Sequence, residues 1–199
     1  YAYLVSAVPM AYIIGRVLKG IDIRQYGSGN AGTSNVYVHV SKKAILPVGL
    51  FDVIVKGACS VWLARYGLDL GLGAQALCGL VAVIGHNWSV YLRFNGGRGI
   101  ATAVGVLFAL SYKVLLPFAV VGLVGWLITR NSALWVGISI LILPFWALLL
   151  GEPPTVVLFC IALLLITVIK RLLANMSGFP DEPHWLQVMK YRLLYDRDI

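Results

Sequence analysis

The sequence carries little charge, and this scarcity excludes an ordinary soluble domain. Only 12% of its 199 residues are Asp, Glu, Lys or Arg, while 60% are hydrophobic. A soluble domain ordinarily carries about 25% charged residues. Acidic residues are the rarest of these, with 8 Asp and Glu against 16 Lys and Arg, so the net charge is +8. The basic residues lie between apolar runs and in the tail, as in membrane proteins, so we expect no nucleic-acid partner.

Cysteine is scarce as well, and its number and placement argue against a disulfide framework and against a cysteine metal site. The 3 cysteines are Cys59, Cys78 and Cys160, and each falls inside an apolar run. An odd count does not make a disulfide framework, and the spacing matches no metal-binding motif. We interpret these residues as small buried hydrophobic side chains and predict no metal site.

Long apolar runs are abundant, and they predict an all-α polytopic membrane protein with about seven transmembrane helices, since about 20 apolar residues span a bilayer core. The first run begins at Tyr1 and has no basic leader or small-residue cleavage site, so we interpret it as a truncated first span. The run at 100–112 is short for a straight crossing. The expected spans are 1–18, 44–64, 72–87, 100–112, 113–129, 133–150 and 154–170.

The distribution of basic residues predicts the topology. Apart from Arg65, Lys113 and Lys56, all of the 16 Lys and Arg fall on one side of the expected spans. The positive-inside rule makes that side cytoplasmic. The polar loops 19–43 and 88–99 and the C-terminus are therefore expected to face the cytoplasm.

The sequence after the last span predicts a separate tail. We divide the chain into a membrane domain, 1–173, and a cytoplasmic tail, 174–199. Phe179–Pro183 interrupts any helix there. Apolar and basic residues then alternate, which suits an amphipathic helix on the membrane surface, although a packed or partly ordered tail suits the same pattern.

The first polar loop has the composition of an anion-binding loop. Glycine permits positive φ and close backbone approach, and successive N–H groups in such a loop form a concavity for anions. Neighbouring hydroxyl, amide and ammonium groups would add donors. An ordinary solvated loop is the alternative. The candidate phosphate-binding residues are Gly27, Ser28, Gly29, Asn30, Gly32, Asn35 and Lys43.

The second polar loop strengthens that interpretation. Gly96, Gly97, Arg98 and Gly99 open a span, and Thr102 follows on its first turn. An arginine at a helix N-terminus combines a fork of donors with the helix dipole. An interfacial arginine among helix-breaking glycines is the alternative.

His86 ends the preceding span and has several possible roles. It suits a general base, a donor to phosphate or a structural histidine at a helix end.

Asp52 and Lys56 bring opposite charges into an apolar span. They stand four residues apart in the sequence and so share one helix face. Charged groups inside a span are costly and face the bundle interior. A mutually neutralising structural pair and a direct role toward substrate both remain open.

Several segments together resemble one enzyme family. Gly27-Ser28-Gly29-Asn30-x-Gly32-x-x-Asn35 resembles the first signature of the bacterial membrane-integral acyl-phosphate:glycerol-3-phosphate acyltransferases of the PlsY type. Phe51-Asp52-x-x-x-Lys56-Gly57 resembles a further family element. Gly85-His86, followed by Leu92-x-Phe94-x-Gly96-Gly97-Arg98-Gly99-Ile100-Ala101-Thr102, resembles the second signature.

The resemblance implies a seven-helix fold in the bacterial inner membrane with an active site open to the cytoplasm. It implies transfer of an acyl chain from acyl phosphate to the 1-position of glycerol 3-phosphate, giving lysophosphatidic acid, with no metal or nucleotide cofactor. Membrane lipids and the two substrates are the implied partners. Ser28, Arg98 and His86 would be the catalytic residues, and Arg171 would add a phosphate contact.

The sequence also departs from the family pattern. Arg98 stands where the family usually has Lys, and Val38 stands where an Arg is common. The third signature is reduced to Ile169–Leu173. These departures leave an alternative open, in which the chain is a non-catalytic paralogue acting as a structural or lipid-binding subunit of a larger membrane complex.

Overall fold

The computed structural model describes residues 1–173 and 185–195, and every regular element in these ranges is a helix. This confirms the all-α prediction. The chain forms two compact units, Tyr1–Leu110 and Ser111–Ile199. The predicted division near residue 173 stays a prediction.

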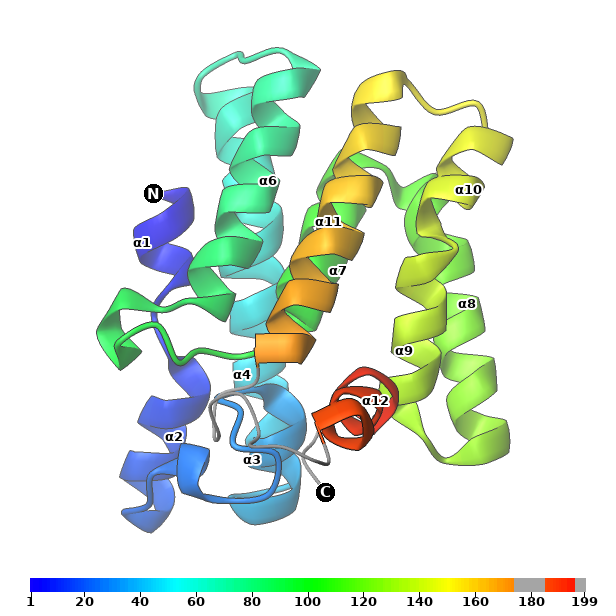
Figure 1. Cartoon of the computed structure of the whole chain (residues 1–199). Coiled ribbons are helices and arrows are strands. Elements are labelled where there is room, and N and C mark those ends of the chain that lie inside the picture. The colour runs from blue at the N-terminus through cyan, green and yellow to red at the C-terminus, as the bar shows by residue number, and fades with distance from the viewer. Residues whose placement is uncertain (174–184, 196–199) are drawn as a thin grey trace. The chain divides into compact units, whose positions relative to one another are not determined.

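Unit 1 holds the elements on both sides of the two polar loops. The segment from α4 to η3 runs as one helix over Ile45–Gly67, with π-helical turns at η2 and η3. Within unit 1, α7 packs against η2. Helix α1 packs against α6 (Figure 1). The elements of unit 1 are α1 (Ala2–Ser6), α2 (Met10–Lys19), η1 (Ile23–Gln25), α3 (Thr33–His39), α4 (Ile45–Leu50), η2 (Phe51–Ala58), α5 (Cys59–Trp62), η3 (Leu63–Gly67), α6 (Leu72–Asn87), η4 (Val90–Leu92) and α7 (Ile100–Leu110).

Two glycines let α7 and η2 cross at backbone contact. A Cβ added to Gly105 would overlap the carbonyl oxygen of Val53, and one added to Gly57 would overlap that of Thr102. In lipid the hydrophobic effect does not drive helices together, so their association depends on van der Waals packing. Small residues favour it because they let two backbones approach closely. The crossing therefore fixes α7, and the loop that leads into it, against the buried face of η2.

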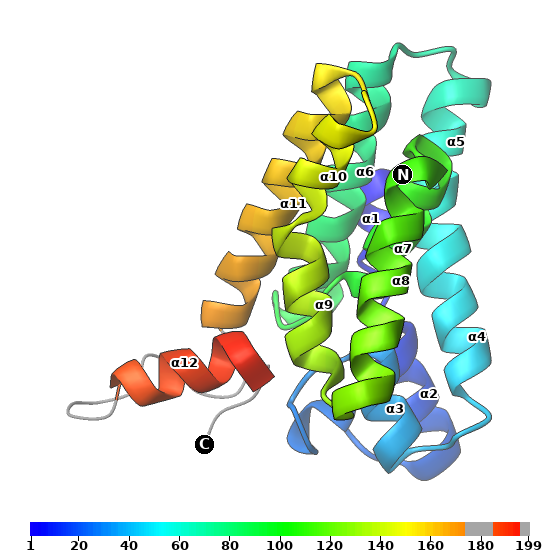
Figure 2. The same ribbon diagram turned by 90° about the vertical axis from the view of Figure 1, so that its right-hand side faces the viewer.

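Unit 2 is built from longer apolar helices. Ser111 begins it, and its Oγ accepts a hydrogen bond from the Val114 N–H in the first turn of α8. Helix α8 packs against α9, and α10 packs against α11 (Figure 2). The elements of unit 2 are α8 (Tyr112–Thr129), α9 (Ser132–Leu141), α10 (Leu143–Leu149), α11 (Pro154–Leu173) and α12 (Trp185–Tyr195).

The lengths of the helices support a multi-pass membrane protein. Among the described residues 4 helices are long and apolar enough to cross a bilayer, and α9 with α10, bent by 43°, makes up to 5. Helices α6 and α7, with 16 and 11 residues, are shorter than a straight crossing needs. The count of about seven spans stays a prediction. The four candidate spans are Ala2–Lys19, Ile45–Gly67, Tyr112–Thr129 and Pro154–Leu173.

The tail contains the expected helix, α12, which packs against other helices of unit 2. Helix α12 contacts α9 and α11. Arg171 of α11 donates to the Leu193 carbonyl of α12 (2.6 Å), and Arg192 of α12 donates back to the Leu172 carbonyl (2.8 Å). This packing favours the packed alternative for 185–195. The predicted helix break at Phe179–Pro183 and the last residues, 196–199, lie outside the described residues.

Candidate functional site

The first glycine-rich loop adopts the backbone that its sequence predicts. Gly27 and Gly29 have φ of 54° and 68°, the left-handed region that favours glycine. Asn35, on the first turns of α3, lies beneath the loop. Its Nδ2 donates to the carbonyls of Ile23 (2.9 Å), Tyr26 (2.9 Å) and Asn30 (3.1 Å). Asn35 therefore holds the loop in shape, and the donors that we expected it to offer to phosphate are directed at the loop backbone.

The other predicted residues of this loop differ in exposure. Asn30 is buried, Ser28 is half-buried, and Gly32 is half-buried at the start of α3. Lys43 is exposed, and its backbone N–H donates to Ser41 Oγ (3.2 Å). Ser28 thus has the access that contact with a substrate needs.

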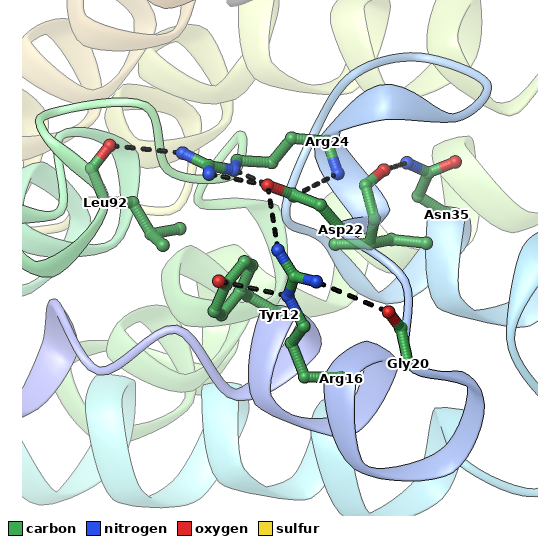
Figure 3. Close-up of polar contacts among 8 residues, drawn as sticks. Tyr12, Arg16, Gly20, Asp22, Arg24, Asn35 and Leu92 are labelled. Atoms are coloured by element: carbon green, nitrogen blue, oxygen red, sulfur yellow. Dashed lines mark hydrogen bonds and ion pairs between the residues drawn. The ribbon is translucent and has the colours of Figure 1, made fainter.

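An ion-pair network ties the first loop to the second (Figure 3). Arg24 donates to Asp22 through Nη2 (2.7 Å) and Nε (3.0 Å) and reaches the Leu92 carbonyl of the second loop through Nη1 (3.4 Å). Arg16 adds a longer ion pair to Asp22 (3.9 Å) and donates to the Tyr12 hydroxyl (3.1 Å). Arg24 therefore joins two loops that lie far apart in the sequence.

This network gives a pH-dependent contribution to stability. The side-chain hydrogen bond from Arg24 holds the pKa of Asp22 below its ordinary value. Because the pKa is depressed in the folded state, the stabilisation is present above the unfolded value of about 3.9 and is lost as the pH falls through the folded pKa. We expect the melting temperature of the wild type to drop on acidification below about pH 4 more steeply than that of Asp22→Asn.

Thermal unfolding in detergent from neutral to acidic pH measures this difference. Asp69→Asn, which removes an exposed carboxylate outside the network, serves as the matched control. Parallel pH profiles for the wild type and Asp22→Asn would contradict the assignment.

The second loop is held against the end of α6 by its backbone. The N–H of Gly96 donates to the Asn87 carbonyl (3.2 Å), and that of Gly97 donates to the His86 carbonyl (3.1 Å). A Cβ on Gly96 would overlap the carbonyl oxygen of His86, and one on Gly97 would overlap its Nε2. Gly99, with φ of 73°, leads into α7. These glycines are required because the loop passes directly over the backbone and side chain of His86.

Asp52, Lys56 and His86 form a buried polar cluster next to this loop. Lys56 Nζ lies 2.7 Å from Asp52 Oδ1 and 3.2 Å from His86 Nδ1. The three side chains expose only 2%, 2% and 5% of their surface. The expectation that Asp52 and Lys56 share a helix face is confirmed, and the structure adds His86 to the pair.

A small recess brings the loops and the cluster together. Its walls include Ala31 of the first loop, Gly96 and Gly97 of the second, and Lys56 and His86 of the cluster. It is partly open to solvent, and its cavity volume of about 10 Å³ is room for a single water molecule. The imidazole of His86 and the ammonium of Lys56 line it and suit anionic oxygen atoms, whereas the N–H groups of Gly96 and Gly97 already donate to the carbonyls of Asn87 and His86.

Comparison with known proteins gives a family match over most of the chain. The sequence profile of the family described as "Glycerol-3-phosphate acyltransferase" matches residues 1–177. The chain belongs to the glycerol-3-phosphate acyltransferase family.

Individual relatives carry the same description. The chain is 39% identical over 202 residues to glycerol-3-phosphate acyltransferase 4 of Dehalococcoides mccartyi strain CBDB1, covering 99% of this chain and 86% of that protein. It is 42% identical over 132 residues to glycerol-3-phosphate acyltransferase of Gloeobacter violaceus, covering 65% of this chain and 64% of that protein.

Solved structures of the family resemble the whole fold. The crystal structure of PlsY, an integral membrane glycerol 3-phosphate acyltransferase, in its glycerol 3-phosphate form is 29% identical and has a TM-score of 0.79. The alignment covers 100% of this chain and 90% of the PlsY chain. The lysophosphatidic acid form gives a TM-score of 0.77 at 28% identity.

The remaining predicted residues of this acyltransferase family member lie in different surroundings. Arg98 is half-buried between Gly97 and Gly99. Thr102 is fully buried in the first turn of α7, and its Oγ1 has no partner among residues 1–173 and 185–195. Arg171 belongs to unit 2, where it is buried and donates to the Ala133 carbonyl (2.8 Å) as well as to α12. Arg171 thus has a structural role there, and its predicted phosphate contact stays a prediction.

Sequence reasoning missed two features of the site. The Asp22–Arg24 pair received no role, although an Asp-x-Arg sequence just after a helix-ending glycine is a local pattern that could have indicated it. Asn87 was also passed over. It is fully buried, and its amide oxygen would lie 2.5 Å from a Cβ placed on Gly99, so it supports the point where the second loop enters α7.

Proposed function

We propose that this chain transfers an acyl group from acyl phosphate to the 1-hydroxyl of glycerol 3-phosphate, giving lysophosphatidic acid and inorganic phosphate. The observation that carries the proposal is the joining of two glycine-rich loops over His86 in a member of this family. Both substrates carry a phosphate, and each loop offers donors for one. The comparisons give no support to a non-catalytic paralogue.

The reaction needs the protein mainly to position the two substrates and to stabilise their negative charge. Acyl phosphate is a mixed anhydride. The glycerol oxygen attacks the acyl carbon, the bond from that carbon to the phosphate oxygen breaks, and the hydroxyl proton goes to the departing phosphate. Positioning and electrostatic stabilisation then supply most of the rate enhancement.

The proposed roles follow from access and charge. Ser28 and Arg98 are half-buried and would contact the phosphates, while His86 reaches the recess from below. The guanidinium of Arg98 presents two donors in one plane, where a lysine would present a single charge. The backbone at Gly27 and Gly99 would add donors, whereas the N–H groups of Gly29 and Gly97 already donate to the carbonyls of Tyr26 and His86. Asn30 and Gly32 would close the first loop. Lys43, Thr102 and Arg171 stay as predicted contributors.

We infer that both loops open to the cytoplasmic face of a bacterial inner membrane and that about seven segments cross it. The concentration of Lys and Arg on the side of the loops supports this orientation. Substrates made in the cytoplasm would reach the loops directly, and the product would pass into the surrounding lipid.

The test is an assay of the purified protein with palmitoyl phosphate and glycerol 3-phosphate. We expect phosphate release with formation of lysophosphatidic acid. Arg98→Ala should lower kcat/KM about 10- to 150-fold, the loss of about 1.5–3 kcal/mol expected for one charged hydrogen bond. Ser28→Ala should also lower it, and Arg98→Lys should retain more activity than Arg98→Ala.

Arg93→Ala is the matched control, because Arg93 is exposed in the same loop and has no assigned role. No turnover by the wild-type protein, or equal losses in Arg93→Ala and Arg98→Ala, would count against the proposal.

A further inference from the structure

The buried cluster decides how the His86 imidazole is protonated. Lys56 Nζ lies 3.2 Å from His86 Nδ1, within hydrogen-bond range, whereas Asp52 Oδ1 lies 3.7 Å from that nitrogen and is too far to accept from it. A lysine ammonium donates and cannot accept. The 2.7 Å ion pair with Asp52 favours the ammonium form of Lys56, in which case His86 Nδ1 accepts from it and the hydrogen of a neutral imidazole resides on Nε2.

The other imidazole nitrogen is directed at the junction of the two loops. His86 Nε2 lies so close to Gly97 that a Cβ there would overlap it, and the Ala31 carbonyl lies 3.1 Å from the same point. Lys56 and His86 both line the recess between these loops. His86 Nε2 thus lies beside the place where the two glycine-rich segments meet.

The cluster is held in this arrangement by further contacts. Asp52 holds the Lys56 ammonium at 2.7 Å. The Lys56 carbonyl accepts from Ser60 Oγ (2.6 Å) and Ser6 Oγ (3.4 Å), which anchors the π-helical turn that carries the lysine. A pair that served only to neutralise itself would need no contact with an imidazole.

We propose that Lys56, held by Asp52, is a positioning residue that fixes His86 in the Nε2–H tautomer, so that His86 presents a hydrogen-bond donor to a substrate phosphate between the loops. In this role His86 donates and does not act as a general base. The assignment to phosphate rests on the proposed function, whereas the tautomer rests on the geometry of the cluster alone.

The tautomer is measured directly by nitrogen NMR of histidine-labelled protein in lipid nanodiscs. The chain contains 3 histidines, and loss of a signal in His86→Gln identifies the one of interest. We expect hydrogen on Nε2 and a bare Nδ1 in the wild type. Lys56→Met should shift His86 toward the other tautomer. Hydrogen on Nδ1 in the wild type would overturn the proposal.

Kinetics then separate positioning from simple structural support. Lys56→Met should lower kcat/KM about 10- to 100-fold, the loss expected for a misplaced charge-assisted hydrogen bond. The glutamine of His86→Gln supplies an amide donor and has no tautomers. In that background Lys56→Met should lower kcat/KM by less than about 2-fold further, because the effects of interacting residues are not additive. Lys56→Arg should restore part of the activity. Losses that multiply independently would overturn the proposal.

Two further variants guard against misfolding. Asp52→Asn combined with Lys56→Met removes the pair without leaving a lone buried charge, and it should show the same NMR shift as Lys56→Met. Lys113→Met, which removes an exposed lysine from the start of α8, should leave both readouts unchanged. An inactive wild type would count against the proposed function, while the NMR result would still test the tautomer.

Discussion

Gly97→Ala is expected to lower kcat/KM about 100-fold or more while the protein remains folded, since a misplacement of about 1 Å at a reacting centre costs roughly that much. The added Cβ would overlap His86 Nε2 and approach the Ala31 carbonyl to 3.1 Å. His86 cannot simply swing aside, because it is buried and hydrogen-bonded to Lys56. The second loop must therefore lift away from the first. Steady-state kinetics with both substrates varied measure the effect.

Gly73→Ala is the matched control for this substitution. Gly73 lies in α6, and nothing stands within 4 Å of the position that its Cβ would take. We expect wild-type kinetics from it. Wild-type kinetics from Gly97→Ala as well would show that the contact between this loop and His86 has no part in catalysis.

Gly105→Ala is expected to destabilise the fold more than a Gly→Ala substitution at any other position. Its Cβ would overlap the Val53 carbonyl oxygen and lie 3.0 Å from the Ala58 nitrogen, and both of these are backbone atoms that cannot rotate away. We expect a loss of at least the ~1–3 kcal/mol that overpacking usually costs, seen as a lower melting temperature in detergent. The yield of monodisperse protein should fall with it.

Two companion variants make the stability test specific. Gly57→Ala, on the facing surface of the same crossing, should be destabilising for the same reason. Gly73→Ala should keep or raise the melting temperature, because alanine is favoured over glycine in an open helix position by up to about 1 kcal/mol. A Gly105→Ala protein as stable as Gly73→Ala would mean that α7 and η2 are not in backbone contact.

Features that depend on near neighbours in the sequence were predicted well. Helical spacing alone places Asp52 beside Lys56, and the observed 2.7 Å ion pair agrees. The glycines of the first loop were expected to permit positive φ; Gly27 and Gly29 adopt it, whereas Gly32 has a φ of −127°. The apolar runs predicted helices, although run length alone could not reveal that α9 and α10 are bent by 43°.

Contacts between distant segments could not be predicted in the same way. The Arg24 contact to Leu92 and the Lys56 contact to His86 join segments whose approach depends on how whole helices pack. The composition of a loop likewise does not say which way an amide points. Asn35 has the chemistry of a phosphate ligand, yet its Nδ2 faces the loop backbone because three carbonyls there need donors.

The crossing of Gly57 and Gly105 also limits how this protein can diverge. Backbone atoms meet there, so neither helix can slide along the other to absorb an inserted or deleted residue. We expect the number of residues from Gly99 to Gly105 to stay constant among homologous sequences.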